Sequence, residues 1–388
     1  MAVLRLNFYY FCRIMAGLYI HFPFCNSRCA YCDFFSTVNK ELIPDYINTV
    51  RFEMVQRKEW LEEETVNTIY FGGGTPSLMK REYLLSLFDQ IESSFTIDPN
   101  AEVTIEVNPD DINTEYAQVL SNLPFNRVSI GIQSMDDNLL KLIDRRHNSE
   151  QAINAIKLCS KAKFKNISVD LIYGLPGQTI EGFQEDINTV LALNVNHLSA
   201  YHLSYEKGTK LTRLKERGMI TPIDENCSEK MYNILCRTMR QSGFIHYEIS
   251  NFCQLGMESK HNSGYWQGAN YLGLGAGAHS YNQRERCWNI SDLDVYMKRV
   301  KKEIPAIKKE VLSGKNRINE MLMLSLRTLR GLDMGLFISR FGQEVGRAIM
   351  IKAERHIGTG SLIHDGESLR FTEKSLFISD NIISDLFF

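Results

Sequence analysis

Short apolar runs alternate along the first half of the chain with longer segments in which apolar residues recur every three or four positions. The short runs are typical of buried strands, and the longer segments are typical of helices that pack on them. Strands are predicted at residues 18–22, 68–71, 102–107, 127–132, 167–172 and 197–203. Helices are predicted at residues 44–60, 80–94, 114–121, 135–143, 149–162 and 178–193. This alternation predicts an α/β fold, with a parallel sheet covered by helices.

The C-terminal part follows another pattern. Further helices are predicted at residues 226–242, 292–302, 318–328 and 343–355, with a strand at 244–249 and a hairpin formed by 361–364 and 369–372. Helices followed by a hairpin predict a small helical, winged-helix-like domain. We therefore expect a main domain at residues 17–290 and a C-terminal domain at 291–388. Residues 1–16 are expected to be a disordered extension or the product of an upstream start, because Met15 offers a second start position.

Composition narrows the class of protein. The chain has 388 residues, 44% hydrophobic and 23% charged, which is typical of a globular protein with more than one domain. Its net charge of −2 gives no reason to expect a nucleic acid partner. No apolar run is long enough to predict a membrane span, and residues 1–14 lack the small-residue cleavage site of a signal peptide. Six of the nine cysteines are scattered singly, so we expect a reducing, cytoplasmic location.

The other three cysteines form a motif. Cys25, Cys29 and Cys32 are spaced Cys-x3-Cys-x2-Cys directly after the first predicted strand. Three thiolates suit a [4Fe–4S] cluster, and they leave one iron open to a small molecule. A structural zinc site takes four protein ligands, usually as two Cys-x2-Cys pairs, and no second pair follows here. Zinc binding and three unrelated buried thiols remain the alternatives.

A three-cysteine loop after the first strand of an α/β chain resembles the radical S-adenosylmethionine (SAM) superfamily. The resemblance implies that the six strand–helix units form an open, partial (β/α)6 barrel. It also implies that the amino and carboxylate groups of SAM bind the open iron. One electron, from a donor that the sequence does not identify, would then split SAM into methionine and a 5′-deoxyadenosyl radical.

Polar or glycine-rich segments follow most of the predicted strands, and in such folds the strand ends meet at one site. By resemblance, the glycine run would receive the amino group of SAM, and a glutamine and an arginine would bind its nucleoside and carboxylate ends. Arg146 is a competing choice for that arginine. The alternative roles are a tight turn for Gly73, a solvated edge position for Glu106 and plain strand packing for Tyr19. The SAM residues implied are Tyr19, Gly73, Gly74, Thr75, Glu106, Gln133, Arg145 and Asp170.

Several longer motifs resemble the coproporphyrinogen III oxidase-like branch of this superfamily. They include Tyr-Ile-His-Phe-Pro-Phe-Cys at residues 19–25 and Asp-Leu-Ile-Tyr-Gly-Leu-Pro-Gly-Gln at 170–178. Within the branch, the oxygen-independent oxidase usually carries a further cysteine two positions after the third ligand, where this chain has Phe34. The HemW-type haem chaperones carry His-Asn-x-x-Tyr-Trp, which matches residues 261–266. Both features favour a chaperone, and the oxidase, which decarboxylates porphyrinogen propionates, is the alternative.

The resemblance implies that haem is a third bound group, beside the cluster and SAM. His261 offers an imidazole for haem iron, and Tyr265 and Trp266 offer flat apolar surface. The segment could instead close the barrel mouth without touching iron. A chaperone of this kind would deliver haem to an acceptor protein, and the sequence leaves open the acceptor, a peripheral membrane contact through it, and homodimer formation. Whether the chain is also an enzyme is left open too.

Overall fold

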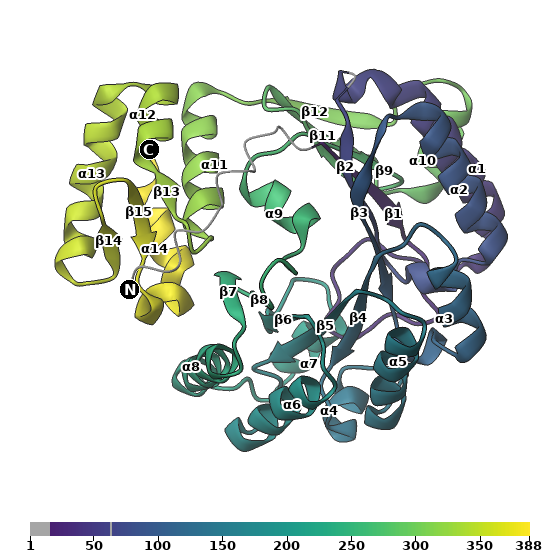
Figure 1. The fold of residues 1–388 in the computed structure, drawn as a ribbon, viewed down its shortest axis with the longest axis horizontal. Coiled ribbons are helices and arrows are strands. Elements are labelled where there is room, and N and C mark those ends of the chain that lie inside the picture. The colour runs from purple at the N-terminus through teal and green to yellow at the C-terminus, as the bar shows by residue number, and fades with distance from the viewer. Residues whose placement is uncertain (1–15, 63) are drawn as a thin grey trace.

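The structure, a computed structural model, describes residues 16–62 and 64–388 (Figure 1). The predicted N-terminal extension therefore lies outside the described residues, except for Ala16, which begins the first strand.

One large sheet dominates the described part of the chain. Its strand order is β12-β11-β10-β9-β1-β2-β3-β4-β5-β6-β8-β7. Strands β1 to β6 are parallel and lie in sequence order, which confirms the predicted strand–helix units and the open partial barrel. The six strands are β1 (Ala16–Phe22), β2 (Val66–Gly73), β3 (Ile97–Val107), β4 (Arg127–Gln133), β5 (Asn166–Tyr173) and β6 (His197–His202).

Both edges of the sheet continue beyond these six strands. Strand β9 pairs in parallel with β1, and β10, β11 and β12 follow antiparallel. At the other edge, β8 and β7 are antiparallel to β6. Because β12 ends at Val311, the sheet runs past residue 290, and the predicted domain division there stays a prediction. The added strands are β7 (Ile245–Glu248), β8 (Asn251–Cys253), β9 (Tyr271–Leu274), β10 (His279–Tyr281), β11 (Glu285–Asn289) and β12 (Ile307–Val311).

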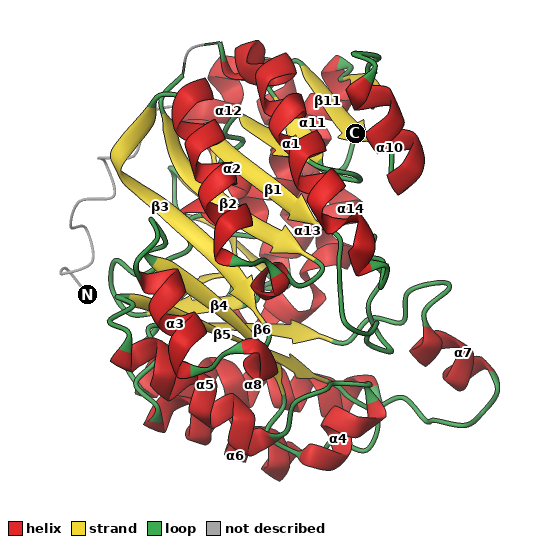
Figure 2. Ribbon diagram, turned by 90° about the vertical axis from the view of Figure 1, so that its right-hand side faces the viewer, coloured by secondary structure: helices red, strands yellow, loops and turns green. Residues whose placement is uncertain are grey.

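Helices cover the outer face of the sheet (Figures 1 and 2). Helix α1 packs against both α2 and α10, and α6 packs against α8. The helices between β1 and β12 are α1 (Ile43–Arg57), α2 (Arg81–Ser94), α3 (Thr114–Ser121), α4 (Asp137–Leu142), α5 (Ser149–Lys161), α6 (Ile180–Ala192), α7 (Lys210–Glu216), α8 (Glu225–Gln241), α9 (Lys260–Trp266) and α10 (Leu293–Lys301).

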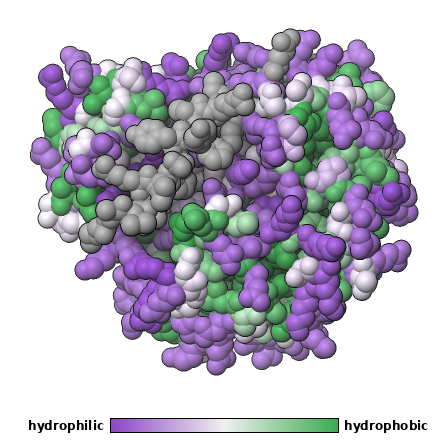
Figure 3. All heavy atoms as spheres, in the orientation of Figure 1, coloured by the Kyte–Doolittle hydropathy of each residue, from purple (hydrophilic) through white to green (hydrophobic). Residues whose placement is uncertain are grey.

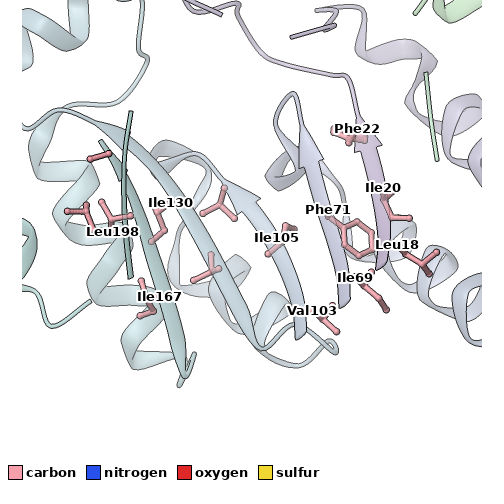
Figure 4. Packing of buried hydrophobic residues seen from close by; sticks show 14 of the residues in the cluster. Leu18, Ile20, Phe22, Ile69, Phe71, Val103, Ile105, Ile130, Ile167 and Leu198 are labelled. Carbon is pink, nitrogen blue, oxygen red and sulfur yellow. The ribbon is translucent and has the colours of Figure 1, made fainter. Parts of the chain in front are cut away.

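The two faces of the parallel strands differ in chemistry. Alternate residues such as Leu18, Ile20 and Phe71 are buried together in the apolar core beneath the helices (Figure 4). The residues between them point to the opposite, inner face, because successive side chains of a strand alternate. This inner face is mostly polar, and its buried members include Thr68, Glu102, Thr104, Arg127, Ser129, Ser168, His197 and Ser199. The barrel interior is therefore a polar space suited to a ligand.

The C-terminal part forms a separate group of helices and a small sheet, at the left of Figure 1. The sheet order is β13-β15-β14, and the β14–β15 hairpin confirms the predicted one. Backbone hydrogen bonds attach this part to the barrel, from Ile249 N to Arg327 O and from Leu329 N to Tyr247 O, each 3.1 Å long. Its elements are α11 (Gly314–Leu326), β13 (Leu332–Asp333), α12 (Met334–Phe341), α13 (Gln343–Gly358), β14 (Leu362–His364), β15 (Ser368–Phe371) and α14 (Ser379–Leu386).

None of the described helices is both long and apolar enough to span a membrane. Hydrophilic side chains form most of the face shown in Figure 3, and hydrophobic ones lie between them in small groups.

Candidate functional site

The cysteine loop leaves the end of β1 and is closed at its base by backbone hydrogen bonds. Cys25 N donates to Thr37 O at 2.9 Å, and Thr37 N donates to Pro23 O at 2.7 Å. All three cysteines are partly exposed. Burial raises the pKa of Cys32 to about 11, and the charges of Cys29 and Cys25 act in the same direction. The three thiols therefore share one neighbourhood, as ligands of one cluster must.

The described residues show no ready-made site for a single metal ion. Among residues 16–62 and 64–388, no three His, Cys, Asp or Glu side chains are grouped so that they could hold one metal ion. Zinc draws its ligands around one atom, whereas a four-iron cluster binds each cysteine at a different iron. The cluster ligands and the zinc alternative both stay predictions.

The glycine run at the end of β2 lies against the end of β1. Gly74 N donates to Phe22 O at 2.8 Å, and Gly73 N donates to Glu106 Oε2 at 3.1 Å. Gly73 has a φ of +110°, and a Cβ there would lie 2.5 Å from the ring of His21. The close approach and the positive φ both require glycine. An ammonium group only donates hydrogen bonds, so the amino group of SAM would bind this run through its carbonyl oxygens.

Thr75 lies closer to the cysteine loop than the resemblance implied. It is buried, and its N donates to Phe24 O at 2.9 Å. Burial raises the pKa of Cys25, and a hydrogen bond from the Thr75 side chain opposes this rise. Thr75 thus contacts a predicted cluster ligand, and its predicted contact with SAM stays a prediction.

Glu106 carries a partly buried carboxyl group on the inner face. Tyr70 Oη donates to its Oε1 at 2.7 Å, opposite the Gly73 contact on Oε2. Burial raises the pKa of Glu106 to about 7, and the nearby charge of Asp170 adds to the effect. A cation placed beside Glu106 would hold the carboxyl group ionised, so the position suits a ligand ammonium group.

Tyr19, on β1, lies near the carboxyl group of Glu106. Its ring stacks on Tyr70 with centroids 6.1 Å apart, and its hydroxyl lies 3.0 Å from His21 Nδ1. The charge of Glu106 contributes to the raised pKa of Tyr19, although burial is the larger cause.

Arg145 points into the barrel toward the cysteine loop. Its guanidinium donates to Cys29 Sγ at 3.5 Å, to Asn108 Oδ1 at 2.9 Å and to Gly131 O. Its Nε is buried and has no partner among the described residues. A buried cation with an unused donor is suited to a carboxylate ligand.

Arg146 is held by two acidic residues. It forms ion pairs with Asp110 at 2.8 Å and Asp111 at 3.2 Å. The geometry therefore selects Arg145 over Arg146 as the arginine that faces the site.

Gln133 and Asp170 complete the predicted SAM set. Gln133 ends β4 with a φ of +73°, at an irregularity in the β4–β5 pairing. Asp170 lies beside Gly131 in that pairing, and Ser129 Oγ lies 3.2 Å from both of its carboxylate oxygens. Burial raises the pKa of Asp170, and the hydrogen bonds from Ser199 and Ser129 and the charge of Arg127 oppose the rise. Glu106, Gln133, Arg145 and Asp170 thus gather at the inner face of β3 to β5.

His261 lies on α9, which Figure 1 shows beside the sheet, and its ring stacks on those of Tyr70 and Tyr19 with centroids 5.0 Å and 6.4 Å apart. Its Nδ1 is 2.8 Å from Thr68 Oγ1, and its Nε2 is 2.8 Å from Tyr265 Oη. Burial lowers the pKa of His261 to about 3, with a further contribution from the charge of Arg127. Both ring nitrogens are engaged, so binding haem iron would require one hydrogen bond to break. The predicted haem contact stays a prediction, and the geometry favours a role in packing.

A cavity of about 460 Å³ lies on the other side of β1. Tyr19 is the one predicted SAM residue in its lining, to which α9, β9, β10, α11 and the residues after Cys32 also contribute. Tyr265, the tyrosine that the sequence offers to haem and the partner of His261 Nε2, is therefore part of this lining. The sequence interpretation missed this cavity, for which the glycine-rich segment at 273–281 was the available signal. Residues that characterise its lining are Tyr19, Phe34, Phe35, His279, Tyr281 and Glu320.

Comparison with known proteins now adds to this geometry. Residues 19–190 match the radical SAM superfamily, and residues 312–378 match the HemN C-terminal domain. The "heme chaperone HemW" of Lactococcus lactis is 34% identical over 365 residues, covering 94% of this chain and 95% of that protein. The chain belongs to the HemW family. The protein of the same name from Bacillus subtilis is 33% identical, covering 91% of this chain and 94% of its own length.

The HemW family carries the radical SAM domain, and that superfamily implies a [4Fe–4S] cluster and SAM. The fold comparison agrees. The structure of coproporphyrinogen III oxidase (HemN) from Escherichia coli, described there as a radical SAM enzyme, superposes with a TM-score of 0.83. It covers 96% of this chain and 90% of that chain at 22% identity, which confirms the predicted fold.

Proposed function

We propose that the protein is a haem chaperone, which binds haem, a [4Fe–4S] cluster and SAM and delivers haem to an acceptor protein. The observation that carries the proposal is the 34% identity to a heme chaperone HemW over almost the whole of both chains. Phe34 supports it, because the oxidases of this branch usually carry a cysteine at that position.

We assign the cluster to Cys25, Cys29 and Cys32. The loop that carries them is closed at its base by backbone hydrogen bonds, and the donor set is the soft thiolate type that iron–sulfur clusters take. Three protein ligands leave one iron for SAM.

SAM would lie between the cysteine loop and the inner ends of β2 to β5. Glu106 is suited to the ammonium group of SAM, and Arg145 is suited to its carboxylate through the unused Nε. Gln133 and Asp170 lie where a nucleoside would extend, with Asp170 able to accept hydrogen bonds from ribose hydroxyls. Bound SAM would supply a reactive sulfonium, and the chain's own residues hold and orient it.

The proposed function also requires an electron donor and an acceptor protein. A reducing electron donor would be needed for any cleavage of SAM, and the acceptor would set any contact with a membrane surface. We propose a cytoplasmic location, since the scattered cysteines and an exposed cluster loop suit a reducing compartment.

The deciding experiment incubates the cluster-reconstituted protein anaerobically with haem, and separately with coproporphyrinogen III, SAM and a reductant. A chaperone binds haem in a stable complex, transfers it to an apo-haemoprotein and yields no decarboxylated porphyrinogen. Decarboxylation at a rate of roughly 1 per second or faster, as is typical of enzymes, would establish the oxidase instead.

A further inference from the structure

The cavity beside the cysteine loop contains a histidine with no assigned role. His279 begins β10 and is exposed in the cavity lining. Its ring stacks on Trp288 at a centroid distance of 6.0 Å and an interplanar angle of 20°, which fixes the orientation of the imidazole. Within the described part of the chain, neither ring nitrogen of His279 has a hydrogen-bond partner, in contrast to those of His261.

We propose that haem binds in this cavity and that His279 is the axial ligand of its iron. The inference rests on the proposed haem chaperone function and names the site where that function would be carried out. Iron ligation needs a neutral imidazole with a free nitrogen that a large ligand can reach. Burial and the charge of Arg286 lower the pKa of His279, so the neutral form prevails at neutral pH.

The walls of the cavity suit a flat apolar macrocycle. Phe34, Phe35 and Tyr281 line it, and its volume of about 460 Å³ is in the usual range of pockets for small ligands. The side chain of Phe34 is 65% exposed, which is unusual for a large apolar residue. A porphyrin face would cover this ring, and aromatic side chains pack well against a flat π-system.

The charges around the cavity limit how haem can be oriented. Arg286 lies in the lining with its guanidinium 5.9 Å from the ring of Tyr281, and it also pairs with Glu320. Its further N–H donors can bind one propionate. Asp33 and Glu320 would repel a second carboxylate, so the second propionate should point to solvent. An exposed propionate edge would leave haem accessible to an acceptor.

Phe34 lines this cavity and is also the residue that distinguishes this chain from the oxygen-independent oxidases. It follows the predicted cluster ligand Cys32 by two positions, where the oxidases usually carry a further cysteine. Haem bound here would lie next to the cluster loop and against Tyr19, which the resemblance assigns to SAM.

The experiment titrates haem into the full, cluster-reconstituted protein under anaerobic conditions and records the Soret difference spectrum. The variants are His279→Ala, His261→Ala and Phe34→Ala, with His364→Ala as a control because His364 is an exposed histidine of the C-terminal hairpin. We expect His279→Ala to weaken haem binding by at least about tenfold and to shift the Soret band, as loss of a metal contact does. Added imidazole should restore the band. Phe34→Ala should weaken binding with no change of the Soret position, and His364→Ala should match the wild type.

The outcomes separate the two proposals. Wild-type protein that binds no haem would overturn the chaperone function itself. Wild-type binding together with an unchanged spectrum and affinity in His279→Ala would overturn only the site. Loss of the Soret band in His261→Ala, with His279→Ala unaffected, would assign iron ligation to His261. Since Phe34 is exposed, Phe34→Ala should fold normally, and unchanged haem affinity in it would also count against the site.

Discussion

The guanidinium of Arg145 lies 3.5 Å from the sulfur of Cys29, although 116 positions separate the two residues along the chain. The contact joins the loop between α4 and α5 to the middle cysteine of the motif. A buried positive charge at this point stabilises a thiolate and attracts a carboxylate ligand, so it serves both the predicted cluster and the predicted SAM site.

We expect Arg145→Ala to weaken SAM binding by about 10-fold to 100-fold, because a charge-assisted hydrogen bond contributes about 1.5–3 kcal/mol. Arg146→Ala is the matched control, since its guanidinium is already paired with Asp110 and Asp111. Calorimetry measures the affinity of each cluster-reconstituted variant for SAM. Equal losses in the two variants would remove Arg145 from the SAM site.

Each of Cys25→Ala, Cys29→Ala and Cys32→Ala should abolish the visible absorbance of the cluster, because a three-ligand site has no spare thiolate. Cys227→Ala is the control, as Cys227 is also partly exposed but lies on α8. Absorbance and iron content after anaerobic reconstitution check the result. A variant of the motif that keeps the full spectrum would show that its cysteine is not a ligand.

Glu106 should make stability depend on pH in the protein without SAM. Its pKa is raised from 4.5 to about 7, so between these values the folded protein holds a proton that the unfolded chain has lost. The free energy of unfolding should therefore fall as pH rises through this window, by about 3 kcal/mol at most from this group.

Glu106→Gln removes that contribution. Urea unfolding at pH 5 and pH 8 should show the wild type losing more stability than Glu106→Gln over this range. Parallel changes in the two proteins would mean that Glu106 does not carry the buried proton.

His261→Ala should lower the free energy of unfolding by about 2–5 kcal/mol, because the buried hydroxyls of Thr68 and Tyr265 each lose a hydrogen-bond partner. His364→Ala, at an exposed position, should stay within about 0.5 kcal/mol of the wild type. Urea unfolding without haem gives both values. An unchanged stability in His261→Ala would argue against a packing role.

The sequence predicted the parallel strands well because each is a local apolar run with a helix behind it. It predicted the cysteine loop and the polar strand ends for the same reason, since their spacing is local. Arg145 and Arg146 could not be separated, because adjacent residues differ only in the direction that the folded backbone gives them. The structure separates them through Cys29 and Asp110.

The features that the sequence did not reveal depend on distant pairing. Strand β9 is short, and it is a strand because it lies beside β1, more than two hundred residues earlier. The partners of His261 have the same origin, since Thr68 is 193 positions away. Only the assembled barrel shows that His261 has no free nitrogen while His279 has both.

The closure of the cysteine loop by the Cys25 and Thr37 backbone has a consequence for cofactor assembly. The loop is also held at its middle, where Ala30 N donates to Ile143 O at 3.0 Å, so only the segments on either side of Ala30 are left to rearrange when iron and sulfide are inserted. A chain that has lost its inorganic centre to oxygen should therefore stay folded and be repaired in place by a maturation system, without new synthesis.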